Sequence, residues 1–146
     1  MSEKSRVLTR DDEIGEVVRG LRRVAVLGIR SERYADRPAH YVPAALARAG
    51  VEVVPVPVHE PDVGEILGRP VVRDLALVGE VDLVNIFRRP DDLMSHLDAP
   101  PPRRPPRVWL QSGIRHEGFA RALVAAGVSV IEDRCLMVEH RRHGRS

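Results

Sequence analysis

The chain has 146 residues, 43% of them hydrophobic and 30% charged, and carries a formal net charge of +2 at pH 7. This composition predicts one soluble globular domain and excludes a disordered chain. The apolar runs are too short to cross a bilayer, and the charged N-terminus lacks the apolar core of a signal peptide. From these two features we expect no membrane partner. Because a single cysteine, Cys135, cannot form an internal disulfide, we expect a cytoplasmic protein. With a small net charge and five aromatic residues, the chain offers little for phosphate attraction or base stacking, so we expect no nucleic-acid partner.

The first predicted element is a helix near the N-terminus. Thr9 and Asp12 resemble a capping box, and apolar residues recur at helical spacing over residues 14–21. A second helix is expected to start at residue 39 or 40 and to end at Gly50. That start is chosen because Pro43 is tolerated only in the first turn of a helix.

Short apolar strands alternate with the helices along the chain. The strands are expected at residues 23–28, 51–58, 81–87, 107–113 and 128–133, and three more helices at residues 89–98, 116–127 and 134–144. The second strand should stop pairing near Pro57, and a turn at Gly68 and a short helix near Leu75 follow it. The segment "APPPRRPP" at residues 99–106 predicts a rigid extended connection. Strands that are apolar throughout are typical of a parallel sheet with helices on both faces. The predicted fold class is therefore a single α/β domain with a doubly wound, mainly parallel, five-stranded Rossmann-like sheet.

Arginine, glycine and small polar residues follow the predicted strands. In a doubly wound sheet the ligand lies at the carboxyl ends of the strands, near the switch point of the strand order. Gly28, Arg30 and Ser31 follow the first strand, and Arg88 follows the third. Such residues suit an anion held by backbone N–H groups, helix N-termini and guanidinium groups. Gly28 could equally be required by a tight turn, and the arginines could equally be solvated loop charges.

A dinucleotide would need features that this chain lacks. The NAD fingerprint uses three glycines, and only Gly28 is present in the corresponding loop. The fingerprint also places an acid at the end of the second strand, where it binds the ribose hydroxyls. Glu52 comes too early in that strand, and Glu60 comes after two prolines. NAD is therefore disfavoured, and a phosphate-bearing ligand held in another way is preferred.

Motifs for catalysis and for metal binding cannot be assigned. Cys135 has no base at a useful spacing, because His140 lies five residues along the same predicted helix. The six histidines show no metal-ligand spacing. No Ser/His/Asp order, catalytic carboxylate pair or phosphate-loop lysine is found. The pattern favours binding over catalysis and predicts no metal site.

Several stretches, taken in order, resemble the small stand-alone CoA-binding proteins. They include "FRRP" at residues 87–90, "WLQSGIR" at 109–115 and "DRCLMVEH" at 133–140. These proteins are single Rossmann-type domains similar to the CoA-binding domain of the succinyl-CoA synthetase α subunit, and the resemblance covers residues 23–140. We therefore divide the chain into an N-terminal helical extension, residues 1–22, and a CoA-binding Rossmann-type domain, residues 23–146.

The resemblance implies a site for coenzyme A or acyl-CoA. In the family, the loop after the first strand wraps the diphosphate, the end of the second strand lies beside the adenosine, and the loop after the third strand approaches from the other side. The corresponding residues here are Gly28, Ile29, Arg30 and Ser31, then Arg37 and Pro38, then Pro57, Val58 and His59, and finally Phe87 and Arg88. Because no catalytic motif is found, we expect a protein without catalysis of its own that senses or carries CoA or acyl-CoA, or serves a partner enzyme.

The chain departs from the family pattern at three places, and two other functions stay open. Residues 57–59 replace a frequent Asn-Pro followed by a basic residue, Ala39 replaces a frequent capping Ser, and "APPPRRPP" replaces part of a helix. One alternative is an NAD(H)- or nucleotide-responsive regulator on the same fold. The other is an enzyme that uses Cys135 for acyl or thiol exchange. A fold alone does not decide among these functions.

Overall fold

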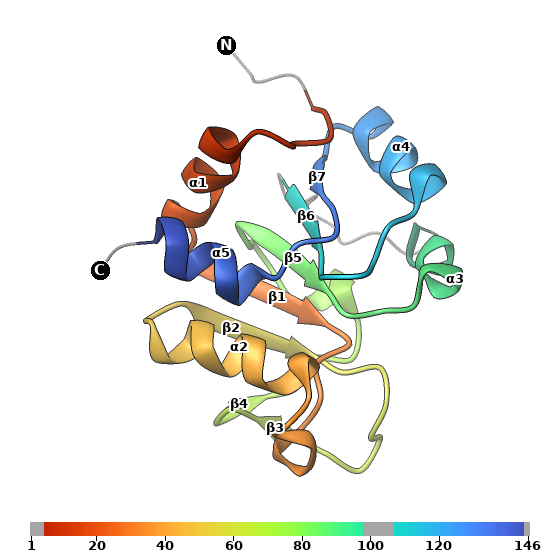
Figure 1. Ribbon diagram of the computed structural model, residues 1–146. Helices are drawn as coiled ribbons and strands as arrows, with labels where there is room; N and C mark the ends of the chain where they lie inside the picture. Colours follow the sequence, from red (N-terminus) through yellow and green to blue (C-terminus); the bar gives the residue numbers. More distant parts are fainter. Residues whose placement is uncertain (1–4, 98–106, 145–146) are drawn as a thin grey trace.

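Five parallel strands form a central sheet between two layers of helices in the computed structural model, which describes residues 5–97 and 107–144 (Figure 1). The strand order is β2-β1-β5-β6-β7. The strands are β1 (Arg23–Leu27), β2 (Glu52–Val56), β5 (Leu83–Ile86), β6 (Arg107–Leu110) and β7 (Ser129–Ile131). One face carries α1 (Asp11–Arg19), α2 (Pro38–Arg48) and α5 (Leu136–His143), and the other carries α3 (Pro90–Leu93) and α4 (Glu117–Ala125). The predicted doubly wound α/β domain is confirmed. No described helix is long and apolar enough to span a bilayer.

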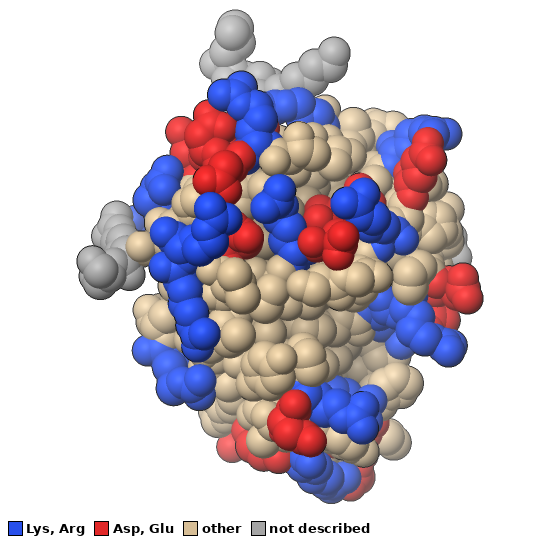
Figure 2. Space-filling view, in the orientation of Figure 1, with Lys and Arg blue, Asp and Glu red and all other residues tan. Residues whose placement is uncertain are grey.

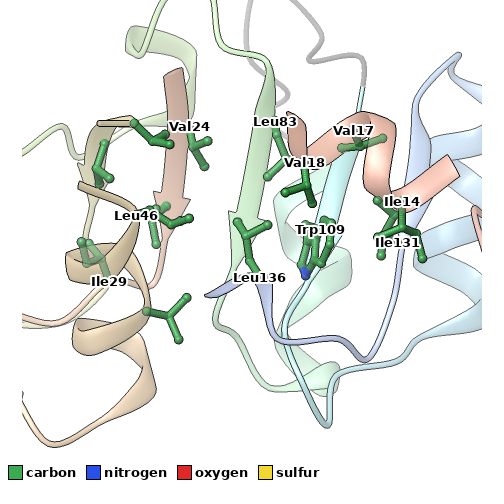
Figure 3. Close-up of a cluster of buried hydrophobic side chains, with 14 of the residues drawn as sticks. Ile14, Val17, Val18, Val24, Ile29, Leu46, Leu83, Trp109, Ile131 and Leu136 are labelled. Carbon is green, nitrogen blue, oxygen red and sulfur yellow. The ribbon is translucent and has the colours of Figure 1, made fainter. Parts of the chain in front are cut away.

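The central strands are buried on both faces, as their apolar sequences predict. Val24 and Val26 of β1 enter the core beneath α1, α2 and α5, whereas Ala25 and Leu27 enter the core on the opposite face. Figure 3 shows the first of these cores, where Trp109 of β6 is fully buried among apolar side chains from β7, α1 and α5. The indole N–H of Trp109 donates a hydrogen bond of 2.8 Å to a main-chain carbonyl, so this large side chain leaves no polar atom unpaired in the core.

Helix α1 and the residues before it pack against the sheet. Apolar side chains of α1 lie in the core with Trp109 (Figure 3). Ahead of the helix, the Leu8 N–H donates to the Val130 carbonyl at 2.8 Å, and the Val130 N–H donates to the Arg6 carbonyl at 3.0 Å. This pairing covers the edge of the sheet that β7 would otherwise expose. The division of the chain at residue 22 stays a prediction.

The capping box predicted at Thr9 is wrong. The residue before α1 is Arg10, and its side chain makes no capping hydrogen bond, since a guanidinium group has no acceptor to offer the helix N-terminus. The first turn instead carries three acidic residues, which interact favourably with the positive end of the helix dipole.

The second helix also starts earlier than expected. It begins at Pro38, so Pro43 lies in its second turn, and the expectation that Pro43 occupies the first turn is wrong. Pro43 has no N–H to donate to the carbonyl of Ala39, four residues earlier. That carbonyl accepts the N–H of Arg30 at 3.1 Å instead. The proline inside the helix therefore leaves one acceptor free to anchor the loop that follows β1.

The connection between β2 and β5 contains one element that the sequence did not predict. The strand β2 ends at Val56, so pairing stops before Pro57 as expected. The strands β3 (Glu65–Ile66) and β4 (Arg69–Pro70) form a small hairpin around the predicted turn at Gly68. The 3-10 helix η2 (Leu75–Leu77) matches the short helix expected there. Elsewhere in the chain, η1 (Glu32–Tyr34) lies before α2 and η3 (Met94–Leu97) follows α3. The predicted "APPPRRPP" connection lies outside the described residues.

Candidate functional site

A cleft opens at the carboxyl ends of β1 and β5. After β1 the chain runs outward to β2 and then returns to β5 on the other side of β1, so these two strands form the switch point where such sheets bind ligands. The cleft has a volume of about 690 Å³. Its lining comes from the loops after the strands and from the first turn of α2: Gly28, Arg30, Tyr34, Arg37, Pro38, Ala39, His59, Phe87, Arg88, Arg89, Pro90, Asp92, Gln111, Ser112 and Ile114.

The structure brings most of the predicted site residues to this cleft. Those that line it are Gly28, Arg30, Arg37, Pro38, His59, Phe87 and Arg88. Pro57 and Val58 line a neighbouring cavity of about 430 Å³, together with Arg73 and His96. Ile29 and Ser31 line neither cavity, because the Ile29 side chain is buried in the core and the Ser31 side chain faces Glu60.

Gly28 allows the loop after β1 to cross closely over the end of β5. Its φ angle is +88°, in a region that other residues rarely adopt. A Cβ atom placed on Gly28 would lie 2.2 Å from the carbonyl oxygen of Phe87. The close approach of two protein loops therefore accounts for this glycine.

The backbone of Arg30 is fixed on both sides. Its N–H donates to the Ala39 carbonyl, and its own carbonyl accepts a hydrogen bond of 3.0 Å from His40 Nδ1. His40 lies buried in the first turn of α2. The guanidinium group of Arg30 lies over the Tyr34 ring, 4.1 Å from the ring centroid, in a cation–π contact. Both the backbone and the side chain of Arg30 are thus positioned before any ligand binds.

Glu60 ties the loop after β2 to the loop after β1. One carboxylate oxygen accepts the Ser31 N–H at 2.9 Å, and the other accepts the Ser31 hydroxyl at 2.5 Å. The Nε of Arg30 lies 3.6 Å from the same carboxylate. Burial alone would raise the pKa of Glu60, but the hydrogen bonds from Ser31 and the charges of Arg30 and Arg33 outweigh burial and hold this pKa below its usual value. Glu60 is therefore a buried carboxylate whose hydrogen bonds are used within the protein.

Arg88 approaches the cleft from the loop after β5. Its Nε donates a hydrogen bond of 3.2 Å to His96 Nε2, and one terminal nitrogen lies 3.8 Å from Asp92. Burial, and then the charge of Arg88, lower the pKa of His96 below its usual value. A neutral His96 can accept from Arg88 at pH 7, so it helps to hold the guanidinium group at the cleft.

The N-terminus of α2 forms another wall of the cleft. Arg37 is the N-cap residue, Pro38 is the first residue of the helix, and Ala39 follows. Within the described part of the chain, the Arg37 side chain has no acidic partner. Pro38 has no N–H and the His40 N–H donates to the Arg37 carbonyl at 2.9 Å, so Ala39 supplies the first-turn N–H at this wall, and the helix dipole adds positive potential. The cleft therefore combines arginines with a helix N-terminus, which suits an anionic ligand.

Comparison with known proteins decides the family. Residues 22–141 match the family model of a CoA binding domain. The chain belongs to this CoA binding domain family. The uncharacterized protein YneT of Bacillus subtilis (strain 168) is 36% identical over 129 residues, which cover 88% of this chain and 92% of the relative. A Thermus thermophilus structure, cell-free ID.343, is 44% identical with a TM-score of 0.81, over 92% of this chain and 98% of its own.

A second solved structure supports the fold alone. A hypothetical protein from Pyrococcus horikoshii OT3 matches with a TM-score of 0.81 at 24% identity. The match covers 97% of the chain described here and 99% of the Pyrococcus chain. The resemblance noted in the sequence is thus confirmed at the level of the family. The assignment of individual residues to CoA stays a prediction.

Some residues that line the cleft were not among the predicted site residues. Tyr34 comes from η1, and Gln111, Ser112 and Ile114 come from the loop after β6. The position of residues 111–114 at the end of a predicted strand was a usable signal. No pattern in the sequence indicated that the Tyr34 ring would contact Arg30.

Cys135 lies at a different cavity of the CoA binding domain. It is the N-cap residue of α5 and lines a cavity of about 460 Å³ beside Asp133 and Glu139. Ser112 lines both this cavity and the cleft. None of the described residues that line the Cys135 cavity is a histidine.

Proposed function

We propose that the protein binds coenzyme A or acyl-CoA in the cleft, through the glycine- and arginine-containing loop after β1, without catalysis of its own. The observation that carries this proposal is the convergence of Arg30, Arg37 and Arg88 on a cleft at the switch point. Membership of the CoA binding domain family supports the ligand class.

The diphosphate is assigned to the end of the cleft formed by the loop after β1 and α2. Arg30 is held ready by Tyr34 and by its backbone hydrogen bonds, and Arg37 has no acidic partner among the described residues. The N–H of Ala39 adds a first-turn donor on the same wall. Guanidinium groups and helix N–H groups are the usual partners of phosphate oxygens.

The adenine and the pantetheine arm are assigned to apolar surfaces on either side. Val56, Pro57 and Leu75 line the neighbouring cavity and offer an apolar wall for the adenine ring. Phe87 and Ile114 line the cleft at the ends of β5 and β6, where they can contact the pantetheine arm. His59 lines the cleft next to Val58 of the neighbouring cavity, so one ligand can span both.

The contacts of Glu60 argue against the NAD alternative. An acid that binds ribose hydroxyls must present free carboxylate oxygens to the ligand. Both oxygens of Glu60 already accept hydrogen bonds from Ser31. The titration below compares CoA directly with NAD.

We also propose that Cys135 takes no part in catalysis. A nucleophilic thiol needs a base within hydrogen-bond reach. Cys135 faces a cavity other than the cleft, and no histidine is among its described lining residues. Binding without chemistry suits a protein that carries or senses CoA, or that presents it to a partner enzyme.

Native mass spectrometry of the freshly purified protein is the first test. It should detect CoA or an acyl-CoA bound to each chain. Titration of ligand-free protein should then show that CoA raises the melting temperature more than NAD at equal concentration, since a ligand that binds the folded state stabilises it by mass action. Pantetheine, which lacks both the diphosphate and the phosphorylated adenosine, should bind much more weakly than CoA. Strong stabilisation by NAD with none by CoA would overturn the proposal.

A further inference from the structure

A cluster of potential metal ligands lies between α1 and α5, away from the residues that line the cleft. Asp11 lies in the first turn of α1, and Glu139 and His143 lie one turn apart on α5. The two helices pack side by side (Figure 1), and red and blue side chains interleave over them in Figure 2. We propose that Asp11, Glu139 and His143 bind a borderline divalent metal ion such as Zn²⁺, Co²⁺ or Ni²⁺. This proposal is independent of the proposed CoA site.

The separations of the ligand atoms suit a tetrahedral ion. His143 Nε2 lies 3.3 Å from an oxygen of Asp11 and 3.5 Å from an oxygen of Glu139, and one ligand atom of each residue lies within 4.8 Å of the others. A tetrahedral ion with bonds of about 2.0–2.2 Å separates its ligand atoms by about 3.3–3.6 Å. The two carboxylate oxygens lie within 4.8 Å of each other.

The Nε2 atom of His143 is buried and makes no hydrogen bond within the described residues, although it faces two carboxylates. A ring nitrogen that makes no hydrogen bond and faces two carboxylate oxygens has the arrangement of a metal ligand beside two further oxygen ligands.

Gly15 makes room for the histidine ring. Glycine destabilises the interior of a helix relative to alanine, so its presence in α1 needs a reason. A Cβ atom on Gly15 would lie 3.0 Å from His143 Nδ1 and 3.0 Å from a terminal nitrogen of Arg19. The glycine therefore lets the ring pack against α1, with its free nitrogen facing Asp11 and Glu139.

The guanidinium group of Arg142 contacts the carboxylates of Asp11 and Glu139 in the structure. One terminal nitrogen of Arg142 lies 3.3 Å from Asp11 and 3.2 Å from Glu139. Arg134 lies 3.8 Å from the other oxygen of Glu139. The Arg142 side chain is about half exposed, at 51%, so it can turn into solvent when an ion enters. The two carboxylates balance the charge of a divalent ion, and Arg142 is its competitor.

Metal titration of the full chain, free of any histidine tag and stripped with a chelator, tests the site. Titration with Zn²⁺ should give one ion per chain, and Co²⁺ should show the absorption bands of a four- or five-coordinate complex. His143→Ala and the nearly isosteric Asp11→Asn should each weaken binding by at least about tenfold, as loss of a ligand requires. Arg142→Ala should strengthen binding because it removes the competing cation.

His140→Ala is the matched control, because His140 lies on the same helix outside the cluster. It should leave the affinity unchanged, and circular dichroism should show every variant folded. If His143→Ala and Asp11→Asn bind zinc as the wild type does, or if His140→Ala removes binding, the proposal is wrong. The cluster would then be an ion-pair network in which Arg142 bridges Asp11 and Glu139 and holds α5 to α1.

Discussion

Two loops at the carboxyl edge of the sheet are held by acids of similar geometry but different burial. Glu60, after β2, has a φ angle of +60° and accepts hydrogen bonds from Ser31 in the loop after β1. Asp133, after β7, has a φ angle of +54° and accepts the Gly113 N–H at 2.7 Å in the loop after β6. In each pair, an acid in the left-handed region of backbone conformation reaches back to the loop of a neighbouring strand.

The two acids differ in what surrounds them. The Glu60 side chain is 5% exposed, whereas that of Asp133 is 39% exposed and also contacts Arg115. The Gly113 N–H, followed by Arg115, lowers the pKa of Asp133, so both carboxyl groups are ionised at pH 7. Water can replace a lost partner at the exposed acid but not at the buried one. We therefore expect the loop tied by Glu60 to hold its shape for a ligand more strictly than the loop tied by Asp133.

Alanine at a glycine in each loop should give the largest contrast. Gly28 and Gly113 both have positive φ angles, but only at Gly28 would a Cβ meet backbone, at 2.2 Å from the Phe87 oxygen. Gly28→Ala should lower the free energy of unfolding by about 2–5 kcal/mol, from backbone strain and overpacking together. Gly113→Ala should cost only the strain, about 1–2 kcal/mol. Urea unfolding measures both, and equal losses would show that the crossing over β5 tolerates a side chain.

Arginine substitutions should separate the loops by ligand affinity. Arg30→Ala and Arg37→Ala should each weaken CoA binding about ten- to a hundred-fold, or about 1.5–3 kcal/mol, the scale of hydrogen bonds to charged groups. The loss should shrink as salt rises. Arg33 pairs with Asp62 outside the cleft, and Arg115 pairs with Asp133. Arg33→Ala and Arg115→Ala should leave affinity unchanged in isothermal titration, and small, equal effects at all four positions would locate the phosphates elsewhere.

Neutral versions of the two acids should sharpen the comparison. Glu60→Gln leaves a Ser31 donor without its acceptor in a buried place, so unfolding free energy should fall by about 1–3 kcal/mol. CoA affinity should fall with it, because Arg30 and Ser31 lose their position. Asp133→Asn should change stability little and CoA affinity not at all. Urea unfolding and calorimetric titration of both variants supply the measurement, and a larger effect at Asp133 would reverse the assignment.

The pH dependence of stability should carry the signature of Glu60. Its pKa is lowered in the folded state relative to about 4.3 in an unfolded chain. The ionised group therefore stabilises the fold at pH values above about 4.3, and this contribution is lost as pH falls through the lowered pKa. The difference in unfolding free energy between wild type and Glu60→Gln should shrink on acidification. A difference that stays constant from neutral into acid would show that the charge of Glu60 is not what stabilises the loop.

The smallest effect is expected at Cys135. It lies at the start of α5, beside the loop tied by Asp133, and does not line the cleft. Cys135→Ser should keep CoA affinity within a few-fold of the wild type. Incubation of the wild type with acyl-CoA, followed by mass spectrometry, should show no acyl group on Cys135. A covalent adduct there would favour the enzyme alternative over binding alone.

The sequence predicted the fold and the position of the cleft because both follow from local patterns. Apolar strands alternating with helices predict a parallel sheet, and the residues that follow such strands lie at its ligand-binding edge. Gly28, Arg30 and Arg88 could be placed on that basis. The resemblance to CoA-binding proteins supplied the ligand, which composition and spacing did not.

Contacts between distant segments could not be predicted from local patterns. Pro43 gave no sign that the carbonyl it frees would accept the N–H of Arg30, which lies before the helix. Glu60 was set aside as an acid too far beyond the second strand, yet its backbone turns it back towards Ser31. Asp11 and His143 meet only because α1 and α5 pack together. Each contact depends on the three-dimensional approach of segments whose sequences carry no mark of it.

A crystal structure of the protein with bound CoA tests the central claim most directly. The account predicts that the diphosphate lies in the cleft within hydrogen-bond distance of the Arg30 and Arg37 side chains and of the Ala39 N–H, with both oxygens of Glu60 still bound to Ser31. A diphosphate bound at the Cys135 cavity, or a complex in which Glu60 leaves Ser31 to contact the ligand, would contradict it.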